Sequence, residues 1–201
     1  VATAVWPHGR WRFDFAGRGD HAGTTRLADR RDPVIPLAHT VLAARRAAEA
    51  DDAVATVGRL AVVPGATNAI ASRATAWLDA RAPAAATARH VVAAVTAAAR
   101  AAGDEHAVVV GVEEESWSGG ADFDAGLRDC LSGAVEARLG RVATLPTGAG
   151  HDAAILAARV PSAMLFVRNP SGTSHDPAER ATTDDCLAGV DALVAVAEEL
   201  L

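Results

Sequence analysis

The sequence contains no lysine and no tyrosine, and only two of its 201 residues are cysteines. Every basic side chain is therefore an arginine, and 25 acidic residues outnumber the 19 basic ones to leave a formal net charge of −6. An acidic chain without a basic cluster has nothing to neutralise phosphates, so we expect no binding to nucleic acid or to an anionic membrane. Two cysteines, Cys130 and Cys186, are too few for a disulfide framework.

Long apolar runs are also missing. No stretch reaches the ~18 residues that a membrane-spanning helix requires, and the N-terminus lacks a basic-then-apolar signal pattern. Together with the scarce cysteines, this predicts a cytoplasmic protein. Half of the residues are hydrophobic and 22% are charged, but only four tryptophans and four phenylalanines are present. We therefore expect one large domain or two small ones, with cores built from Ala, Val, Leu and Ile.

The first half of the chain alternates between strand-like and helix-like patterns. Trp11, Phe13 and Phe15 alternate with charged residues, which is typical of a half-buried strand. Further strands are predicted at 54–63, 72–81 and 107–112, and helices at 34–48, after Asp32–Pro33, and at 84–102, ended by Gly103. The order β-α-β-β-α-β predicts four antiparallel strands with two helices on one face, the ferredoxin-like arrangement.

The second half predicts part of a mostly parallel sheet. Helices are expected at 127–139, closed by Gly140, at about 151–158 and at 184–201. A short strand is expected at 142–145, and the apolar run 162–167 is typical of a strand covered on both faces. Two such strands in roughly 85 residues are too few to complete a sheet, which usually has about four to six strands. We expect the missing strands to come from residues before Val1 or from another chain.

Three of the seven histidines lie in loops rich in Gly, Ser and Thr, where binding groups are often displayed. They are His21, His151 and His175, and each could instead hydrogen-bond its own turn. The other four, at positions 8, 39, 90 and 106, are interpreted as core or surface residues. No His-Glu-x-x-His, paired Cys-x-x-Cys or His-x-Asp motif is present, so the ligand set of a hydrolytic zinc site is incomplete. Glu113, Glu114 and Glu115 alternate between faces of a strand and are interpreted as solvated charge.

Nucleophile and phosphate motifs are weak or absent. The chain has no Gly-x-Ser-x-Gly elbow, and neither cysteine neighbours a histidine in the sequence. The glycine-rich loop 148–150 lacks the Lys-Ser/Thr of a P-loop and the full dinucleotide spacing. Its glycines better suit the approach of an anion, such as a carboxylate, to backbone N–H groups at a helix N-terminus.

Five motifs in order resemble the M20-type metallo-amidohydrolases, in particular the branch of allantoate amidohydrolases and N-carbamoyl-L-amino acid hydrolases. The motifs are Gly19-Asp20-His21-Ala22-Gly23-Thr24-Thr25 with Arg30-Arg31-Asp32, Pro64-Gly65-Ala66-Thr67-Asn68-Ala69-Ile70, Leu78-Asp79-Ala80-Arg81, Gly148-Ala149-Gly150-His151-Asp152-Ala153 and Ser174-His175-Asp176-Pro177-Ala178-Glu179. The resemblance covers the family's C-terminal half. It implies a dimerisation or lid domain at 8–115 and the last segment of the catalytic domain at 116–201, without the N-terminal catalytic segment that carries most metal ligands and the glutamate base.

The resemblance also implies a role for each matching residue. His175 would be the one ligand supplied to a site of two divalent metal ions, zinc or manganese. His21 would reach into the partner subunit's cleft and stabilise the oxyanion, while Asn68 and Arg81 would hold the substrate, Arg81 by a bidentate grip on its carboxylate. Backbone donors of the loop would bind the same carboxylate, with His151 beside them; the loop residues are Gly148, Ala149 and Gly150.

The implied function is cleavage of a ureido or carbamoyl C–N bond by a homodimer joined through the lid domain. Allantoate is the leading substrate because residues 6–13 and 164–170 are similar to segments of allantoate amidohydrolases. An N-carbamoyl-L-amino acid hydrolase and a non-catalytic dimerisation fragment are the alternatives. Two positions depart from the family pattern: Arg26-Leu27 replaces Pro-Met, and Asp176 replaces Ser or Asn. With one strong ligand, the segment alone is expected to hold no metal stably and to be inactive.

Overall fold

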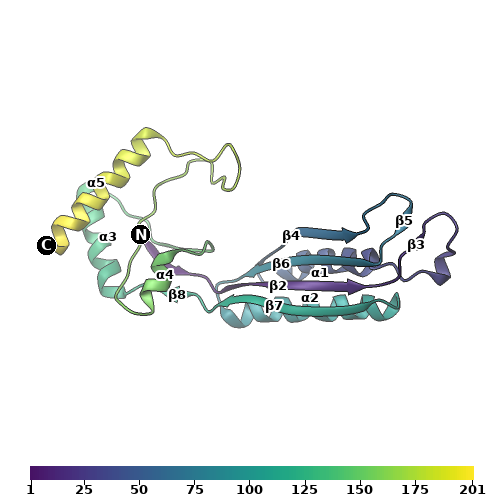
Figure 1. Ribbon diagram of the computed structural model, residues 1–201. Helices are drawn as coiled ribbons and strands as arrows, with labels where there is room; N and C mark the ends of the chain where they lie inside the picture. The colour runs from purple at the N-terminus through teal and green to yellow at the C-terminus, as the bar shows by residue number, and fades with distance from the viewer. The chain divides into compact units, whose positions relative to one another are not determined.

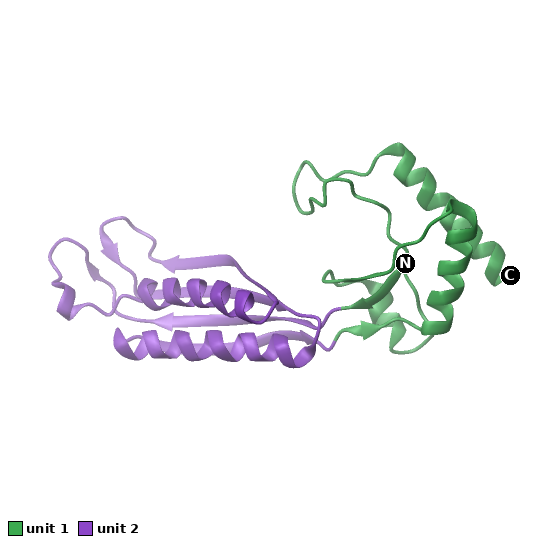
Figure 2. Cartoon of the chain, turned by 180° about the vertical axis from the view of Figure 1, so that it is seen from behind, with its two compact units in different colours: residues 1–5, 120–201 green, residues 6–119 purple.

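The computed structural model describes all 201 residues, which form two compact units (Figure 2). Unit 1 comprises residues 1–5 and 120–201, and unit 2 comprises residues 6–119. The family resemblance implies a boundary between residues 115 and 116, and the sequence patterns assign no structure to residues 1–5. These five residues group with the C-terminal part of the chain because their backbone pairs with it.

Unit 2 is a four-stranded antiparallel sheet with two helices on one face (Figure 1). The strands lie in the order β4-β6-β2-β7, and the elements follow one another along the chain in the predicted order. A two-stranded ladder and a short 3-10 turn complete the unit. The elements are β2 (His8–Ala16), β3 (Asp20–His21), η1 (Leu27–Asp29), α1 (Val34–Ala50), β4 (Val54–Val63), β5 (Ala69–Ile70), β6 (Arg73–Arg81), α2 (Ala85–Glu105) and β7 (Val109–Ser118).

The core of unit 2 lies between the sheet and the two helices. Trp11, Phe13 and Phe15 of β2 are at most 3% exposed and pack with valines of α2 such as Val91 and Val95. The intervening residues of β2 are charged and face the opposite side, as their alternation predicts. Small alanines on β6 let the helices approach the sheet closely, so few aromatic rings suffice to fill this core.

The run of three glutamates lies within β7, which extends further than the predicted range 107–112. Glu113 and Glu115 contact Arg12 at 2.7 and 3.7 Å, whereas Glu114 accepts a hydrogen bond from Trp11 Nε1 at 3.2 Å. The side chains thus alternate between faces as predicted. They are exposed but ion-paired, so solvated charge describes them only in part.

Gly103 does not end the second helix, contrary to the prediction. Helix α2 continues to Glu105, and the residue in the left-handed conformation is Ala107, with φ of 52°. A Cβ at Gly103 would lie 2.5 Å from Cγ2 of Val110 and 2.8 Å from the backbone oxygen of Val108. The glycine is therefore needed for close contact between α2 and β7 rather than for a helix terminus.

Gly103→Ala is expected to destabilise unit 2 by about 1 to 3 kcal/mol, because overpacking outweighs the gain in helix propensity. Gly133→Ala is the matched control: Gly133 lies in a helix of unit 1, and a Cβ there meets nothing within 4 Å. The control is expected to stabilise its helix by about 0.5 to 1 kcal/mol. Urea unfolding measures the first through tryptophan fluorescence, since all four tryptophans lie in unit 2, and the second through circular dichroism. Equal effects of the two substitutions would contradict the packing argument.

Unit 1 contains a mixed three-stranded sheet and three helices. The strands β8 (Ala121–Asp122), β1 (Ala2–Val5) and β9 (Leu145–Thr147) lie in that order, with β1 parallel to β9 and antiparallel to β8. The helices are α3 (Ala125–Leu139), α4 (Asp152–Ala157) and α5 (Thr183–Leu200). Helices α3 and α5 pack together. Gly140 ends α3 with φ of 75°, as predicted.

Two strand predictions in unit 1 are wrong. Residues 162–167 form no strand: their backbone makes only isolated bonds, Met164 O accepting from Ala2 N at 2.8 Å and Ser162 O from Asp124 N at 3.1 Å. The strand expected at 142–145 is instead β9, at Leu145–Thr147. An apolar run predicts burial, but a strand also needs a continuous ladder with a neighbour, and Phe166 and Val167 remain 39% and 49% exposed.

No helix of either unit is long and apolar enough to cross a membrane.

Candidate functional site

His21 and Asn68 are brought together in unit 2 by the short ladder of β3 and β5. His21 lies opposite Ala69, and the N–H of Ala22 donates to the carbonyl of Asn68 at 3.0 Å. Both side chains are exposed. Figure 1 shows the two strands side by side beyond the ends of β2 and β6. Two motifs separated by more than forty residues in the sequence thus form one exposed structure.

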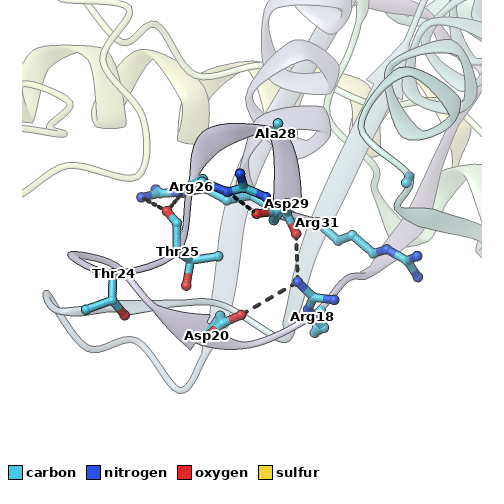
Figure 3. Close-up of a pocket in the computed structure, with 10 residues that line it drawn as sticks. Arg18, Asp20, Thr24, Thr25, Arg26, Ala28, Asp29 and Arg31 are labelled. Atoms are coloured by element: carbon cyan, nitrogen blue, oxygen red, sulfur yellow. Dashed lines mark hydrogen bonds and ion pairs between the residues drawn. The ribbon is translucent and has the colours of Figure 1, made fainter.

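An open depression of about 860 Å³ lies beside this ladder (Figure 3). Most of its arginines are already bonded. Arg18 donates to the carbonyl of Asp29 at 2.7 Å, and Arg26 pairs with the Asp29 carboxylate at 2.7 Å. Arg30 donates to the carbonyls of Ala22 at 2.7 Å and of Thr25 at 3.0 Å. We interpret these bonded arginines as residues that stabilise the loop carrying His21.

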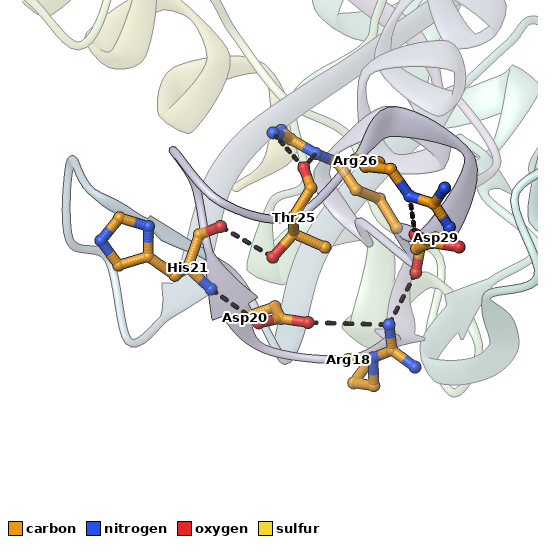
Figure 4. A network of polar contacts seen from close by, with 7 residues as sticks. Arg18, Asp20, His21, Thr25, Arg26 and Asp29 are labelled. Carbon is orange, nitrogen blue, oxygen red and sulfur yellow. Dashed lines mark hydrogen bonds and ion pairs between the residues drawn. The ribbon is translucent and has the colours of Figure 1, made fainter.

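The backbone of His21 is held by neighbouring side chains (Figure 4). Its N–H donates to Asp20 Oδ1 at 2.9 Å, and its carbonyl accepts from Thr25 Oγ1 at 2.8 Å. The His21 N–H and the Thr25 hydroxyl are the main groups that lower the pKa of Asp20, and the charge of Arg18 at 3.6 Å adds to them. Asp20 therefore stays ionised and keeps its bond to the His21 backbone at neutral pH.

Arg81 lies at the other end of the sheet, paired side by side with Asp79. Both residues face the same side of β6 because they are two positions apart. Arg81 Nε and Nη2 donate to the two oxygens of Asp79 at 2.6 and 2.8 Å, and Arg10 Nε lies 3.5 Å from Asp79. Partial burial alone would raise the pKa of Asp79, but the bonds and charge of Arg81, with Arg10, outweigh it and keep that pKa below its usual range. The pair is ionised at neutral pH.

The structure does not bring Arg81 close to the other two residues within one copy of unit 2. Strand β6 runs from Arg73, at the end near β5, to Arg81. Its eight residue steps span about 26 Å at the usual rise of a strand. One copy therefore presents two separate groups, His21 with Asn68 at one end of the sheet and Arg81 with Asp79 at the other.

In unit 1, the loop 148–150 joins β9 to α4. The N–H of Ala149, one of the expected backbone donors, already donates to Thr147 Oγ1 at 3.0 Å. His151 is the N-cap of α4: its Nδ1 accepts from the N–H of Ala153 at 3.0 Å. The imidazole of His151 therefore has a structural role as a helix cap, independent of any contact with a substrate.

His175 has a left-handed backbone, with φ of 60°. Glu179 closes its loop, accepting from the N–H of His175 at 2.9 Å and from Ser174 Oγ at 3.2 Å. Asp176 Oδ1 accepts from the N–H of Ala178 at 2.8 Å, so the unusual carboxylate caps a turn. No three His, Cys, Asp or Glu side chains are grouped to hold a metal ion. One imidazole does not make a metal site.

Several supporting residues received no role from the sequence patterns. Asp20, Gly23 and Arg30 hold the His21 loop, and Asp79 pairs with Arg81. The Asp79–Arg81 pair could be predicted from the sequence, since opposite charges two positions apart on a strand share a face. The bonds from Arg30 to two carbonyls could not be predicted, because they depend on how the loop folds.

The chain belongs to the peptidase family M20/M25/M40, whose model matches residues 40–199. It is similar to an N-carbamoyl-L-amino acid amidohydrolase of Geobacillus stearothermophilus, 31% identical over 96% of the chain and 46% of that protein. It is also similar to an allantoate amidohydrolase of Escherichia coli, 30% identical over the whole chain and 49% of that protein. The chain thus spans about half the length of the curated relatives it matches.

Solved structures show the same α/β fold. The crystal structure of AtUAH in complex with (S)-hydroxyglycine matches with a TM-score of 0.94 and 25% identity, over 99% of this chain and 48% of that one. An amidase of the hydantoinase/carbamoylase family from Burkholderia vietnamiensis matches with a TM-score of 0.93 and 27% identity, over 98% of this chain and 49% of that one. The match extends over both units and about half of each known structure.

Proposed function

We propose that the chain is part of a metal-dependent amidohydrolase that cleaves a ureido or carbamoyl C–N bond, with allantoate as the leading substrate. The observation that carries the proposal is the β3–β5 ladder, which holds His21 and Asn68 together on an exposed loop. An imidazole and a carboxamide displayed in this way can donate hydrogen bonds to a polar substrate. The names of the relatives, allantoate amidohydrolase and N-carbamoyl-L-amino acid amidohydrolase, support the reaction class.

Each predicted site residue keeps its role in this proposal. His21 stabilises the oxyanion that forms on the attacked carbonyl, and Asn68 binds the substrate. Arg81 binds the substrate carboxylate through its fork of N–H groups, and loop 148–150 adds backbone donors beside His151. His175 is the ligand that this chain supplies to two divalent metal ions, zinc or manganese. The remaining ligands belong to the part of the relatives that this chain does not match.

The separation of Arg81 from His21 and Asn68 favours a site shared between two copies. A single small substrate cannot span about 26 Å along a strand. We propose a homodimer in which His21 and Asn68 of one copy act on the substrate held by Arg81 of the other.

Unit 2 is, in this proposal, a ferredoxin-like lid and dimerisation domain corresponding to the predicted range 8–115. Its edge strand β4 pairs only with β6, and an unpaired strand edge readily accepts a second chain. Leu60, Val62 and Val63 of β4 are 52%, 39% and 54% exposed. The other edge, β7, carries the glutamate run and is less suited to pairing with itself because like charges repel.

Unit 1 is, in this proposal, the C-terminal part of a catalytic domain, corresponding to 116–201. Its sheet has three short strands, and α5 exposes an apolar face. Leu187, Val190 and Leu193 on this helix are 57%, 55% and 60% exposed. The apolar face of α5 would be covered if a further segment packed on it. In the relatives, the half of the chain that has no match here is long enough to supply such a segment.

Two alternatives are retained. An N-carbamoyl-L-amino acid hydrolase is favoured by relatives of that name, whose identity equals that of the allantoate enzyme within one percentage point. A non-catalytic dimerisation fragment is favoured by the absence of any grouped metal ligands in the chain.

To test the proposal, the whole reading frame that contains this sequence is expressed and, separately, the 201-residue chain. Both are supplied with Zn²⁺ or Mn²⁺, and ammonia release is measured from allantoate and from N-carbamoyl-L-amino acids. We expect hydrolysis by a product of full family length and neither turnover nor stoichiometric metal for the chain alone. A full-length, metal-loaded product that hydrolyses peptides but no ureido compound would contradict the proposal.

A further inference from the structure

The side chain of His21 also has a hydrogen-bond partner within its own loop. Its Nδ1 lies 3.0 Å from the backbone nitrogen of Gly23, which donates its N–H to the ring. Nδ1 must therefore carry a lone pair, and in the neutral ring the proton then resides on Nε2. No group of the chain bonds Nε2, and Figure 4 shows the ring projecting away from the Asp20–Arg18 side of the network. The loop thus presents a free N–H donor.

The residue that supplies this bond is suited to it by size. A Cβ at Gly23 would lie 3.2 Å from Cε1 and 3.5 Å from Nδ1 of His21. The first distance is tighter than ordinary van der Waals contact, so any larger residue would displace the ring by a few tenths of an ångström. Glycine allows the backbone N–H to approach the ring.

The loop that carries this bond is fixed on both sides. Arg30 donates to the carbonyls of Ala22 and Thr25, which flank Gly23, and the N–H of Ala22 is bonded to Asn68. The donor and the acceptor therefore share one braced turn, and the bond costs little further ordering of the backbone.

We propose that Gly23 is a positioning residue whose N–H holds His21 in the Nε2–H tautomer, so that His21 acts as a hydrogen-bond donor and not as a base. This inference rests on the proposed function for its catalytic meaning, but the tautomer belongs to the chain itself. A base at Nε2 would require a lone pair there, and the bond to Gly23 places a proton on that nitrogen instead. The substrate group that it meets is a developing oxyanion.

Two other histidines of the chain provide internal references. His151 Nδ1 also accepts a backbone N–H, that of Ala153, and so has the same tautomer. His8 Nδ1 lies 2.9 Å from the carbonyl oxygen of Trp6, which can only accept, so His8 has the opposite Nδ1–H tautomer. One sample therefore contains a reference histidine for each of the two tautomers.

The first experiment is ¹⁵N nuclear magnetic resonance of the 201-residue chain labelled uniformly with ¹⁵N. We expect a scalar coupling across the bond between the Gly23 amide nitrogen and His21 Nδ1, and an Nε2–H pattern for His21 opposite to that of His8. His21→Ala assigns the signals. Absence of the coupling in a chain with native tryptophan fluorescence, or an Nδ1–H pattern for His21, would overturn the inference.

Variants separate the positioning role of Gly23 from general damage. Gly23→Ala is expected to remove or weaken the coupling. Gly19→Ala is the control, because a Cβ there meets its nearest neighbour, Ser72 Cβ, at an ordinary 3.4 Å. We expect the control to leave the coupling unchanged. Alanine keeps the backbone N–H, so a coupling of the same size in Gly23→Ala would refute the claim that this bond needs a glycine at position 23.

The donor role is tested in the product of the whole reading frame. Glutamine places an N–H donor near the position of Nε2, whereas asparagine reaches only the position of Nδ1. His21→Gln is expected to keep a kcat at least roughly tenfold above that of His21→Asn. Equal kcat values would overturn the donor role. A wild-type product without ureido hydrolysis would refute the proposed function, while the coupling in the chain would still decide the tautomer.

Discussion

Replacing His21 with alanine is expected to lower kcat about 10²- to 10³-fold, with little change in KM, in the product of the whole reading frame that contains this sequence. In the proposed function His21 donates to charge that develops only in the transition state, so its removal is not expected to weaken ground-state binding. The measurement is steady-state ammonia release from allantoate. A change in KM alone would assign His21 to substrate binding instead.

The same variant tests whether the site is shared between copies. In the proposed homodimer, His21→Ala and Arg81→Ala are each expected to be strongly impaired, but a mixed dimer contains one site with an intact His21 from one copy and an intact Arg81 from the other. After random exchange of subunits in equal amounts, about a quarter of the wild-type activity is expected to return. Mixing without any recovery, in dimers shown to exchange, would place His21 and Arg81 in a site of one copy. The observed separation along β6 argues against that arrangement.

Arg81→Lys is expected to raise KM roughly 5- to 150-fold, a loss of about 1 to 3 kcal/mol of substrate-binding free energy, with a smaller effect on kcat. An ammonium group cannot reproduce the two parallel N–H bonds that the guanidinium offers to a carboxylate. In the structure Arg81 makes two such bonds to Asp79 through Nε and Nη2, so a substrate carboxylate would be bound in exchange for Asp79 or at another edge of the guanidinium. Substrate dependence of the initial rate measures the change, and an unchanged KM would remove Arg81 from the substrate site.

Arg10→Lys is the matched control for this prediction. Arg10 contacts the same carboxylate, but only at 3.5 Å, and its side chain is 67% exposed, against 26% for Arg81. Exposed ion pairs of this kind contribute little, so we expect KM to change less than twofold. An equal effect at both positions would indicate that the charge balance around Asp79 matters rather than the fork of Arg81.

Much of unit 2 could be predicted because its signals are local. Alternation in Trp11–Phe15 identifies β2, and the Asp32–Pro33 start identifies α1; the Asp32 carboxylate accepts from the N–H of Val34 at 3.0 Å. The periods of about 2 residues in a strand and about 3.6 in a helix arise from the geometry of each element alone. They therefore survive in a single sequence without knowledge of the neighbours.

The predictions that fail do so because the structure at those positions is decided by non-local contacts. Gly103 resembles a helix terminus, but its contact is with Val110 of a neighbouring strand. Residues 162–167 resemble a buried strand, yet no continuous ladder partner is present for them. Strand β1 was missed because four residues with no alternating pattern become a strand only through pairing with β8 and β9. In each case the outcome depends on segments that are distant in the sequence.

The candidate site divides in the same way. Which residue types are available, namely the loop histidines, Asn68 and Arg81, follows from the order of amino acids and from their resemblance to known motifs. Which of them meet does not. His21 joins Asn68 because two short strands pair, Arg81 is held at the far end by the length of β6, and the proton of His21 is assigned by an N–H two residues away. Hydrogen bonds depend on distance and direction in space, and these exist only after the chain has folded.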